Sequence, residues 1–279
     1  MSYKIIVDSC GELTDEMKAS GFFETASLKI DVNGHHIIDD ETFDQAEFLK
    51  LVAASPNSPK SSCPSPERYM EGYRCDADHV YAVTLSAELS GSYNSAVLGK
   101  NLYHEEYGSK DIHVFNSCSA SVGETLIALK IAECEEKGME FSQIIETVEA
   151  YIRGQHTYFV LETLDTLRKN GRLKGVKAVV ATALNIKPVM GATPDGNICQ
   201  LGQARGIKKA LAKLSEEVIK DLKDSKDKVL AISHCNCRER AEYIRDTLMK
   251  AAEFKDSIIL DTAGISSMYA ADGGVIVVV

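Results

Sequence analysis

The sequence predicts an α/β protein with two domains. A strand followed by a hydroxyl-rich turn and a helix occurs three times in the first half, at Asp8, Ser86 and Asn116. This rhythm is typical of a parallel sheet, whose ligands gather at the carboxyl ends of the strands. Strands and helices still alternate in the second half, but with an antiparallel hairpin added. We therefore expect a parallel-sheet domain over 1–154 and a mixed-sheet domain over 155–279.

The elements of the first half follow from periodicity and turn residues. Short apolar runs predict strands at 4–7, 79–85 and 112–115, and the turn Asn33-Gly34 predicts a hairpin within 25–38. Helical spacing predicts helices from about residue 14, at 41–54, at 66–73, from about residue 93, at 124–136 and at 142–153.

The second half follows in the same way. The turn Thr193-Pro-Asp-Gly196 predicts a hairpin between strands at 186–190 and 198–201. Further strands are predicted at 158–161, 229–233, 258–260 and 275–279, and helices at 164–169, 176–184, 205–222 and 238–251.

Composition excludes several classes of protein. The 279 residues are 44% hydrophobic and 26% charged, which is ordinary for a globular chain with a real core. The net charge of −10 disfavours nucleic acid and limits membrane contact to a transient one, because both surfaces attract clustered Lys and Arg. No apolar run approaches the ~20 residues that span a bilayer, and no signal-peptide pattern precedes the first strand. We expect a cytoplasmic protein.

Two hydroxyl-rich loops are the candidate site. In the first, Ser90, Gly91 and Ser92 stand at a predicted helix start, where free N–H groups are either capped by serine or left for an anion. The second loop, 61–66, adds further serines and lies in a stretch, 55–66, with four of the six prolines. That stretch is either a flexible linker or a rigid loop, and we expect 55–75 to be able to pack on the second domain.

The chemistry suggested by these loops is binding rather than catalysis. The sequence lacks the hydrolase elbow, the nucleotide-phosphate loop, the dinucleotide fingerprint and the zinc-protease motif. Hydroxyls without a paired base are poor nucleophiles, and Asp8 is at least as typical of a turn as of a base.

Metal and cofactor chemistry are not expected either. The eight cysteines form no C-x-x-C pair, and His234-Cys-Asn-Cys237 lacks a second pair of ligands, which favours incidental reduced thiols. We expect no metal and no cofactor. His234 ends a predicted strand and is interpreted as structural, with titration near neutrality as the alternative.

Several motifs in register carry a family resemblance. They are Ile5-Ile-Val-Asp-Ser9, the two serine loops, Asn116-Ser-Cys-Ser-Ala-Ser121, Leu161-Glu-Thr-Leu-Asp-Thr-Leu-Arg-Lys-Asn-Gly-Arg-Leu173, Leu184-Asn-Ile-Lys-Pro188 and Ala204-Arg-Gly-Ile-Lys-Lys-Ala210. Their order and spacing resemble the DegV family over essentially the whole chain. The resemblance implies a two-domain fold with a long-chain fatty acid in a tunnel between the domains. It also implies a non-catalytic carrier that presents the carboxylate to a separate ATP-dependent fatty-acid kinase subunit, which makes an acyl phosphate.

The resemblance also assigns residues. It implies that the carboxylate is held by Ser61, Ser62, Ser90, Gly91 and Ser92, and that Arg205 lies at the domain seam near the ligand or the kinase. Residues expected near the site are Asp8, Ser9, Ser117 and Met268. We expect the two serine loops to converge, as carboxyl-end loops of one sheet.

The sequence departs from the family pattern in three of its motifs. Ser61 and Cys63 stand where Thr and Gln are usual, Asn116 and Cys118 where Asp and Lys are usual, and 265–274 has Met268 near the usual position of a His. The missing His puts coupling to a kinase in question more than lipid binding. Two alternatives therefore stay open: a stand-alone enzyme acting on a small carboxylate or phosphate at Ser61 and Ser90, or a lipid sensor without a kinase partner.

Overall fold

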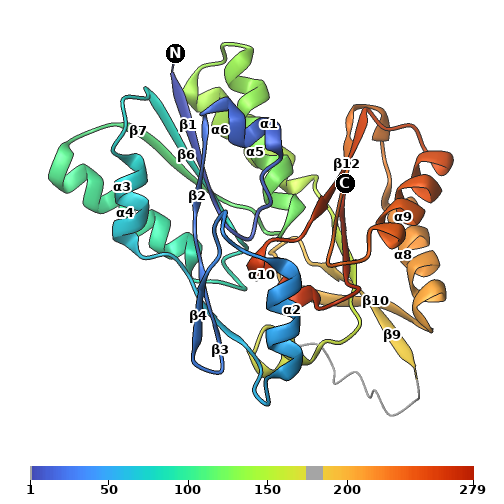
Figure 1. Ribbon diagram of the computed structural model, residues 1–279. Coiled ribbons are helices and arrows are strands. Elements are labelled where there is room, and N and C mark those ends of the chain that lie inside the picture. Colours follow the sequence, from blue (N-terminus) through green and yellow to red (C-terminus); the bar gives the residue numbers. More distant parts are fainter. Residues whose placement is uncertain (1, 174–184) are drawn as a thin grey trace.

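Two large sheets and one small sheet organise the molecule (Figure 1). The computed structural model describes residues 2–173 and 185–279. Segments before residue 155 form a four-stranded sheet and a three-stranded sheet, and segments after it form a six-stranded sheet. The expected α/β class, with a parallel sheet first and a mixed sheet second, is confirmed. The division into domains at residue 155 stays a prediction.

The four-stranded sheet is parallel throughout. Its order is β2 (Phe23–Ala26), β1 (Tyr3–Asp8), β6 (His79–Thr84) and β7 (Asp111–Asn116).

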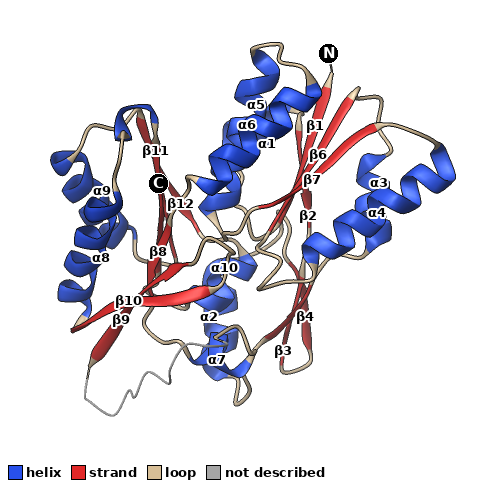
Figure 2. Ribbon diagram, turned by 180° about the vertical axis from the view of Figure 1, so that it is seen from behind, coloured by secondary structure: helices blue, strands red, loops and turns tan. Residues whose placement is uncertain are grey.

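Helices cover both faces of this sheet, as Figure 2 shows. One face carries α1 (Asp15–Ser20), α5 (Val122–Glu136) and α6 (Phe141–Arg153), and the other carries α3 (Pro66–Tyr73) and α4 (Ser92–Tyr107). Side chains alternate accordingly, because successive residues of a strand point to opposite faces. Ile5 and Val7 pack under α5 and α6, whereas Ile6 packs under α3.

A small antiparallel sheet extends the first half toward the second. Its order is β4 (His35–Ile38), β3 (Lys29–Val32) and β5 (Lys60–Ser62), with α2 (Gln45–Ala54) beside it. The proline-rich stretch is thus a shaped segment rather than a flexible linker, since Ser61 pairs with Ile30. It also touches the second half, where Asn170 Nδ2 donates to the Pro59 carbonyl at 2.9 Å.

The six-stranded sheet is mixed. Its order is β10 (Ile198–Arg205), β9 (Ile186–Ala192), β8 (Thr157–Val160), β13 (Val275–Val278), β11 (Val229–His234) and β12 (Asp256–Asp261). Only β11 and β12 pair in parallel. The helices α8 (Ile207–Asp221) and α9 (Arg238–Ala251) cover its outer face (Figure 1).

The two halves meet through apolar contacts. Val122 and Leu126 of α5 pack against Ala231 and Val278 of the six-stranded sheet. Two short helices, α7 (Asp165–Lys169) and α10 (Gly264–Ala270), lie on the inner face of that sheet. This junction is where the two sheets enclose the cavity described below.

Most of the predicted elements are present within two to four residues of their expected bounds. The helix expected at 41–54 begins only at Gln45, because Asp44 caps it by accepting from the Glu47 N–H. The strands β2 and β5 and the helix α10 were not predicted, and the helix expected at 176–184 lies outside the described residues. Across the described segments, the structure contains no helix that is both long and apolar enough to cross a bilayer.

Candidate ligand-binding cavity

A cavity of about 290 Å³ lies between the two halves. Apolar side chains form its middle. Leu28, Leu85, Leu89 and Ile265 line one wall, and Phe159, Leu161, Leu167, Ile198 and Ile276 line the other. A chamber of this kind holds a mainly hydrocarbon molecule, because burying apolar surface is favourable in proportion to its area.

One end of the cavity carries serines from both of the predicted serine loops. Ser61 and Ser62 come from β5, and Ser90 and Gly91 come from the turn after β6. A Cβ on Gly91 would lie 3.2 Å from the Cys63 Sγ, so glycine lets these two segments approach closely. The serine loops therefore converge, but not as expected, because β5 belongs to the small antiparallel sheet and not to the parallel one.

Arg172 completes this end, and sequence reasoning missed it. Its Nε donates to the Leu89 carbonyl at 3.1 Å and its Nη1 donates to the Asn170 carbonyl at 2.8 Å. Its guanidinium lies 6.0 Å from the ring of Tyr269, whose hydroxyl is 3.4 Å from the Ser61 Oγ. These two bonds use two of five N–H groups, and Arg172 forms no ion pair with any carboxylate of the described residues. The sequence did contain a signal for Arg172, because this residue belongs to the family motif at 161–173.

The serine end opens to solvent, whereas the opposite end is closed. Ser62 and Gly91 are exposed and Ser61, Ser90 and Arg172 are half-buried. We call this the serine–arginine end.

The strand β8 and the residue that follows it place Thr157, Phe159 and Leu161 on the cavity wall. At about 3.3 Å per residue, Thr157 and Leu161 are about 13 Å apart.

Buried hydroxyls and a thiol line the closed end, which we call the hydroxyl end. Its lining residues are Cys10, Ser119, Ser121, Thr157 and Ser266. The Ser119 Oγ and the Thr157 Oγ1 are 2.6 Å apart. The Ser121 Oγ donates to the Glu12 Oε2 at 2.7 Å, and the Ser266 Oγ donates to the Cys10 carbonyl at 3.0 Å.

Buried carboxyl groups lie behind the hydroxyl end. Burial raises the pKa of Glu12 to about 7 and that of Asp39 to about 6. Burial also raises the pKa of Asp8 and, well above its usual range, that of Glu124. Within the described residues, no hydrogen-bond partner is found for either oxygen of Glu124, whereas Asp8 accepts three hydrogen bonds, so Glu124 is the neutral member of this pair.

Several predicted site residues support the cavity from outside instead of lining it. The Ser92 hydroxyl donates to the Asp8 Oδ2 at 2.5 Å and contacts the Tyr69 hydroxyl at 2.7 Å, and Ser92 is not among the residues that line the cavity. Asp8 is fully buried, and it accepts from the Leu85 N–H at 2.9 Å to hold the turn after β6. Ser9 donates to Asp39, which accepts from the Gly264 and Ile265 N–H groups and so anchors α10.

The remaining predicted residues also lie off the cavity wall. Ser117 bonds within its own turn, to the Ser119 carbonyl at 3.0 Å. Met268 is buried in the apolar cluster beneath α10. Arg205 is exposed at the end of β10 and is not among the residues that line the cavity, so its predicted place at the domain seam near the ligand or the kinase stays a prediction.

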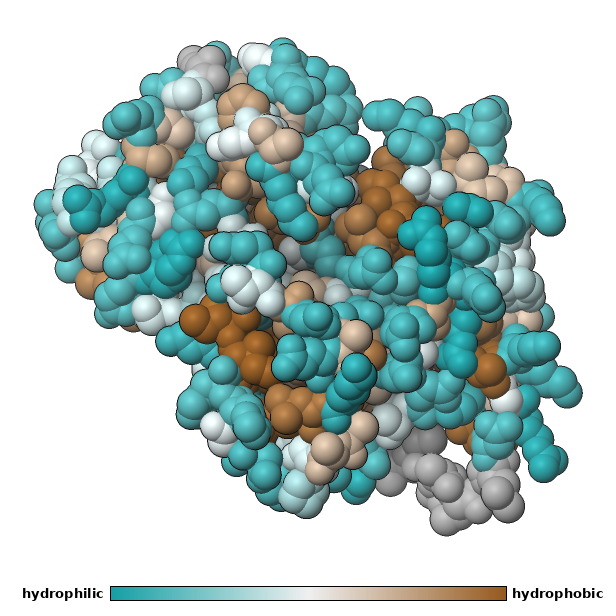
Figure 3. All heavy atoms as spheres, in the orientation of Figure 1, coloured by the Kyte–Doolittle hydropathy of each residue, from teal (hydrophilic) through white to brown (hydrophobic). Residues whose placement is uncertain are grey.

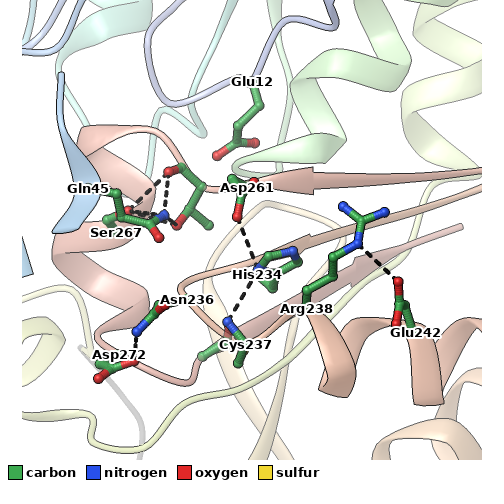
Figure 4. A network of polar contacts seen from close by, with 12 residues as sticks. Glu12, Gln45, His234, Asn236, Cys237, Arg238, Glu242, Asp261, Ser267 and Asp272 are labelled. Atoms are coloured by element: carbon green, nitrogen blue, oxygen red, sulfur yellow. Dashed lines mark hydrogen bonds and ion pairs between the residues drawn. The ribbon is translucent and has the colours of Figure 1, made fainter. Parts of the chain in front are cut away.

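The His234 segment forms a separate polar network, shown in Figure 4. The His234 Nδ1 lies 3.4 Å from the Asp261 Oδ1 and accepts from the Cys237 N–H at 3.4 Å. Burial lowers the pKa of His234, which keeps the imidazole neutral. In the same view Gln45 reaches Ser267, tying α2 to α10. In the part of the chain that the structure describes, no three His, Cys, Asp or Glu residues are arranged to hold a metal ion.

A second hollow lies on the surface between β4 and α2. Ile37, Ile38, Phe43 and Leu51 line it together with His35, Asp40 and Asp44. Figure 3 shows apolar side chains gathered on this face of the molecule, where Ile38 is 52% exposed. This hollow is not continuous with the residues of the cavity.

Fold and site together define an α/β protein that encloses a mainly apolar ligand chamber between two sheets, with a cationic, hydroxyl-lined mouth. The model of the DegV family matches residues 2–279. A DegV domain-containing protein of Streptococcus pneumoniae is 34% identical over 280 residues, covering 99% of this chain and 98% of its own. The chain belongs to the DegV family.

Solved structures of similar proteins agree in fold. A DegV family protein from Ruminococcus gnavus, refined with vaccenic acid, is 62% identical with a TM-score of 0.98, and the match covers 100% of both chains. The Fatty Acid Kinase (Fak) B3 protein of Streptococcus pneumoniae, loaded with linoleic acid, is 32% identical with a TM-score of 0.85, covering 100% of this chain and 99% of its own. DegV family proteins thus bind fatty acids in solved structures.

Proposed function

We propose that this protein binds one long-chain fatty acid in the cavity, with the carboxylate at the serine–arginine end. The observation that carries the proposal is the placement of Arg172 and of Ser61, Ser62 and Ser90 at the open end of an otherwise apolar chamber. The similar proteins with bound vaccenic and linoleic acid support it.

Electrostatics fixes the direction of the ligand. A carboxylate at the serine–arginine end meets a guanidinium and hydroxyl donors, and hydrogen bonds to a charged group are about twice as strong as neutral ones. At the hydroxyl end it would meet Glu12, with Asp8 and Glu124 behind it. The head group therefore stays at the mouth and the chain points inward.

The energy of binding comes mainly from the chain. Burying a methylene group is worth about 0.8 kcal/mol, so a sixteen-carbon chain gains on the order of 10 kcal/mol as an upper bound. The head-group contacts add less, about 1.5–3 kcal/mol for each hydrogen bond to a charge. The contacts at the mouth therefore position the carboxylate more than they hold the lipid.

The open mouth suits a carrier that hands its ligand to another protein. We propose that the carboxylate is presented there to a separate ATP-dependent kinase subunit, which makes the acyl phosphate. In this proposal the carrier itself is non-catalytic, and the kinase subunit supplies the chemistry of phosphoryl transfer. The proposal keeps the cytoplasmic location expected from the sequence, because a partner that consumes ATP acts there.

Extraction of the purified protein followed by mass spectrometry tests the binding proposal. We expect one long-chain fatty acid per chain. A chain that carries no lipid, and takes up none when mixed with octadecanoic acid, would contradict the proposal. Adding a fatty-acid kinase subunit and ATP to the loaded protein then tests presentation, with acyl phosphate as the product measured.

A further inference from the structure

The hydroxyl end holds a hydrogen-bond donor that has no acceptor among the described residues. The Ser119 Oγ and the Thr157 Oγ1 form one hydrogen bond at 2.6 Å, and neither has another partner within the described residues. Each hydroxyl carries one proton, so the pair uses one proton and leaves the other free. Ser119 is 5% exposed and Thr157 is 8% exposed, and both line the cavity. The spare donor therefore faces the cavity and not the bulk solvent.

The fold holds this pair in place. Ser119 belongs to the turn after β7, and its carbonyl accepts a hydrogen bond from the Ser86 N–H at 2.9 Å. A Cβ on Gly123 would lie 2.0 Å from the Ser119 Oγ, so only glycine at this position of α5 leaves room for that hydroxyl. Thr157 is the first residue of β8, a central strand of the six-stranded sheet. The other hydroxyls of this end, on Ser121 and Ser266, already donate to protein oxygens.

A plain hydrocarbon tail leaves the spare donor unsatisfied. A buried polar group without a partner costs free energy that water or a matching polar atom would recover. An apolar end lined by Leu or Ile would suit a methyl terminus better. The pair is matched by an oxygen atom on the chain itself and not by the carboxylate, because Ser119 and Thr157 are buried whereas Ser62 and Gly91 at the serine–arginine end are exposed.

We propose that the hydroxyl end of the cavity recognises long-chain fatty acids that carry a hydroxyl group in the inner half of the chain, through Ser119 and Thr157. A hydroxyl oxygen accepts the spare proton and its own proton has the lone pairs of the pair as acceptors. A second carboxylate is excluded, because no cation of the described residues lines this end and Glu12 lies behind Ser121. The inference rests on the proposed fatty-acid binding and names its preferred substrate class.

Competition between matched acids tests the inference. The purified protein is mixed with octadecanoic acid and an equal amount of an octadecanoic acid with one hydroxyl group, varied from mid-chain to the methyl end. Bound species are counted by native mass spectrometry. We expect at least one hydroxylated isomer to be preferred by about two- to tenfold, the worth of one neutral hydrogen bond. A long-chain dicarboxylic acid, tested in the same way, should bind more weakly than octadecanoic acid.

The variants separate the pair from the rest of the cavity. The double variant Ser119→Ala/Thr157→Val should lose the preference and still bind octadecanoic acid, which also shows that it folds. Each single variant removes one hydroxyl but frees the proton of the other, so Thr157→Val alone should keep much of the preference.

An unchanged ratio in the double variant, a wild-type protein that favours no hydroxylated isomer, or tightest binding of the dicarboxylic acid would each overturn the inference. Failure to bind any of the acids would instead overturn the proposed function.

Discussion

The two ends of the cavity are lined by the same kind of side chain but have opposite electrostatic surroundings. Ser61 and Ser90 share their end with Arg172, whereas Ser121 shares its end with the buried carboxyl group of Glu12. The first end is open and the second is closed. The comparison teaches that hydroxyls alone do not tell a head-group site from a tail site. The charge behind the hydroxyls and the access of solvent distinguish the two kinds of site.

The largest expected effect concerns positioning at the serine–arginine end. The double variant Ser61→Ala/Ser90→Ala should still purify with lipid, because the chain supplies most of the binding energy. Acyl-phosphate formation with a kinase subunit should fall by about 100-fold, since a misplacement of about 1 Å has that effect on a transfer step. Retained lipid and acyl phosphate are measured on one preparation, with the exposed Ser109→Ala as control. Equal losses of lipid and rate would show that the serines anchor the ligand, and normal rates would place the head group elsewhere.

The next effect tests the cation that distinguishes the two ends. Arg172→Gln keeps a donor of similar reach but removes the charge, so affinity for a long-chain fatty acid should fall about 10- to 100-fold, the range of one or two charge-assisted contacts. The matched control is Arg168→Gln, an arginine of α7 that pairs with Asp165 at 3.0 Å and does not line the cavity. Fluorescent fatty-acid displacement measures both. Equal affinities of the two variants for the fatty acid would show that Arg172 does not bind the carboxylate.

The parallel half of the fold was predictable because its signals are local. Buried β-branched runs such as Lys4-Ile-Ile-Val7 and the hydroxyl turns after them specify strand, turn and helix within one stretch of sequence. The elements that sequence reasoning missed depend on distant partners. The strand β5 exists because Ser61 pairs with Ile30, and α10 is anchored by Asp39, more than 200 residues away. Neither pairing leaves a periodic pattern.

The site was predictable only in part for the same reason. Ser90 and Ser92 are identical in type and lie two residues apart, yet Ser90 lines the cavity while Ser92 is fully buried against Asp8. Side-chain direction at a helix start depends on the packing behind it, which the sequence does not display. Arg172 was missed because its motif reads as a helix end, and Arg205 was preferred as a cation although it is exposed on an edge strand.

A smaller effect separates Ser90 from Ser92. Ser92→Ala removes a hydrogen bond to the buried Asp8 and leaves the Tyr69 hydroxyl without this partner, so the free energy of unfolding should fall by about 1–3 kcal/mol. Ser90→Ala removes only the hydrogen bond that its half-buried hydroxyl accepts from the Ser92 N–H at 3.2 Å, so its cost should be smaller, about 0.5–1 kcal/mol. Urea unfolding of both variants provides the measurement. A stable Ser92→Ala protein with weakened lipid binding would show that Ser92 contacts the carboxylate after all.

The smallest effect tests the charge behind the hydroxyl end. The pKa of Glu12 is raised to about 7 by burial, so the folded state holds a proton that the unfolded state releases near pH 4.5. By linkage, stability falls as pH rises from about 4.5 to about 7 and then levels off. Glu12→Gln removes this one proton, so its stability should fall less than that of the wild type, by about 1 kcal/mol between pH 6 and pH 7. Asp39 and Asp8 titrate in both proteins, whereas the charge of Glu12 also helps to raise the pKa of Glu124, so Glu12→Gln relieves Glu124 as well. Glu71→Gln, at an exposed position, serves as control. Parallel pH profiles of stability for the wild type and Glu12→Gln would show that Glu12 is already ionised in the folded protein. The two ends of the cavity would then differ less in charge than the comparison requires.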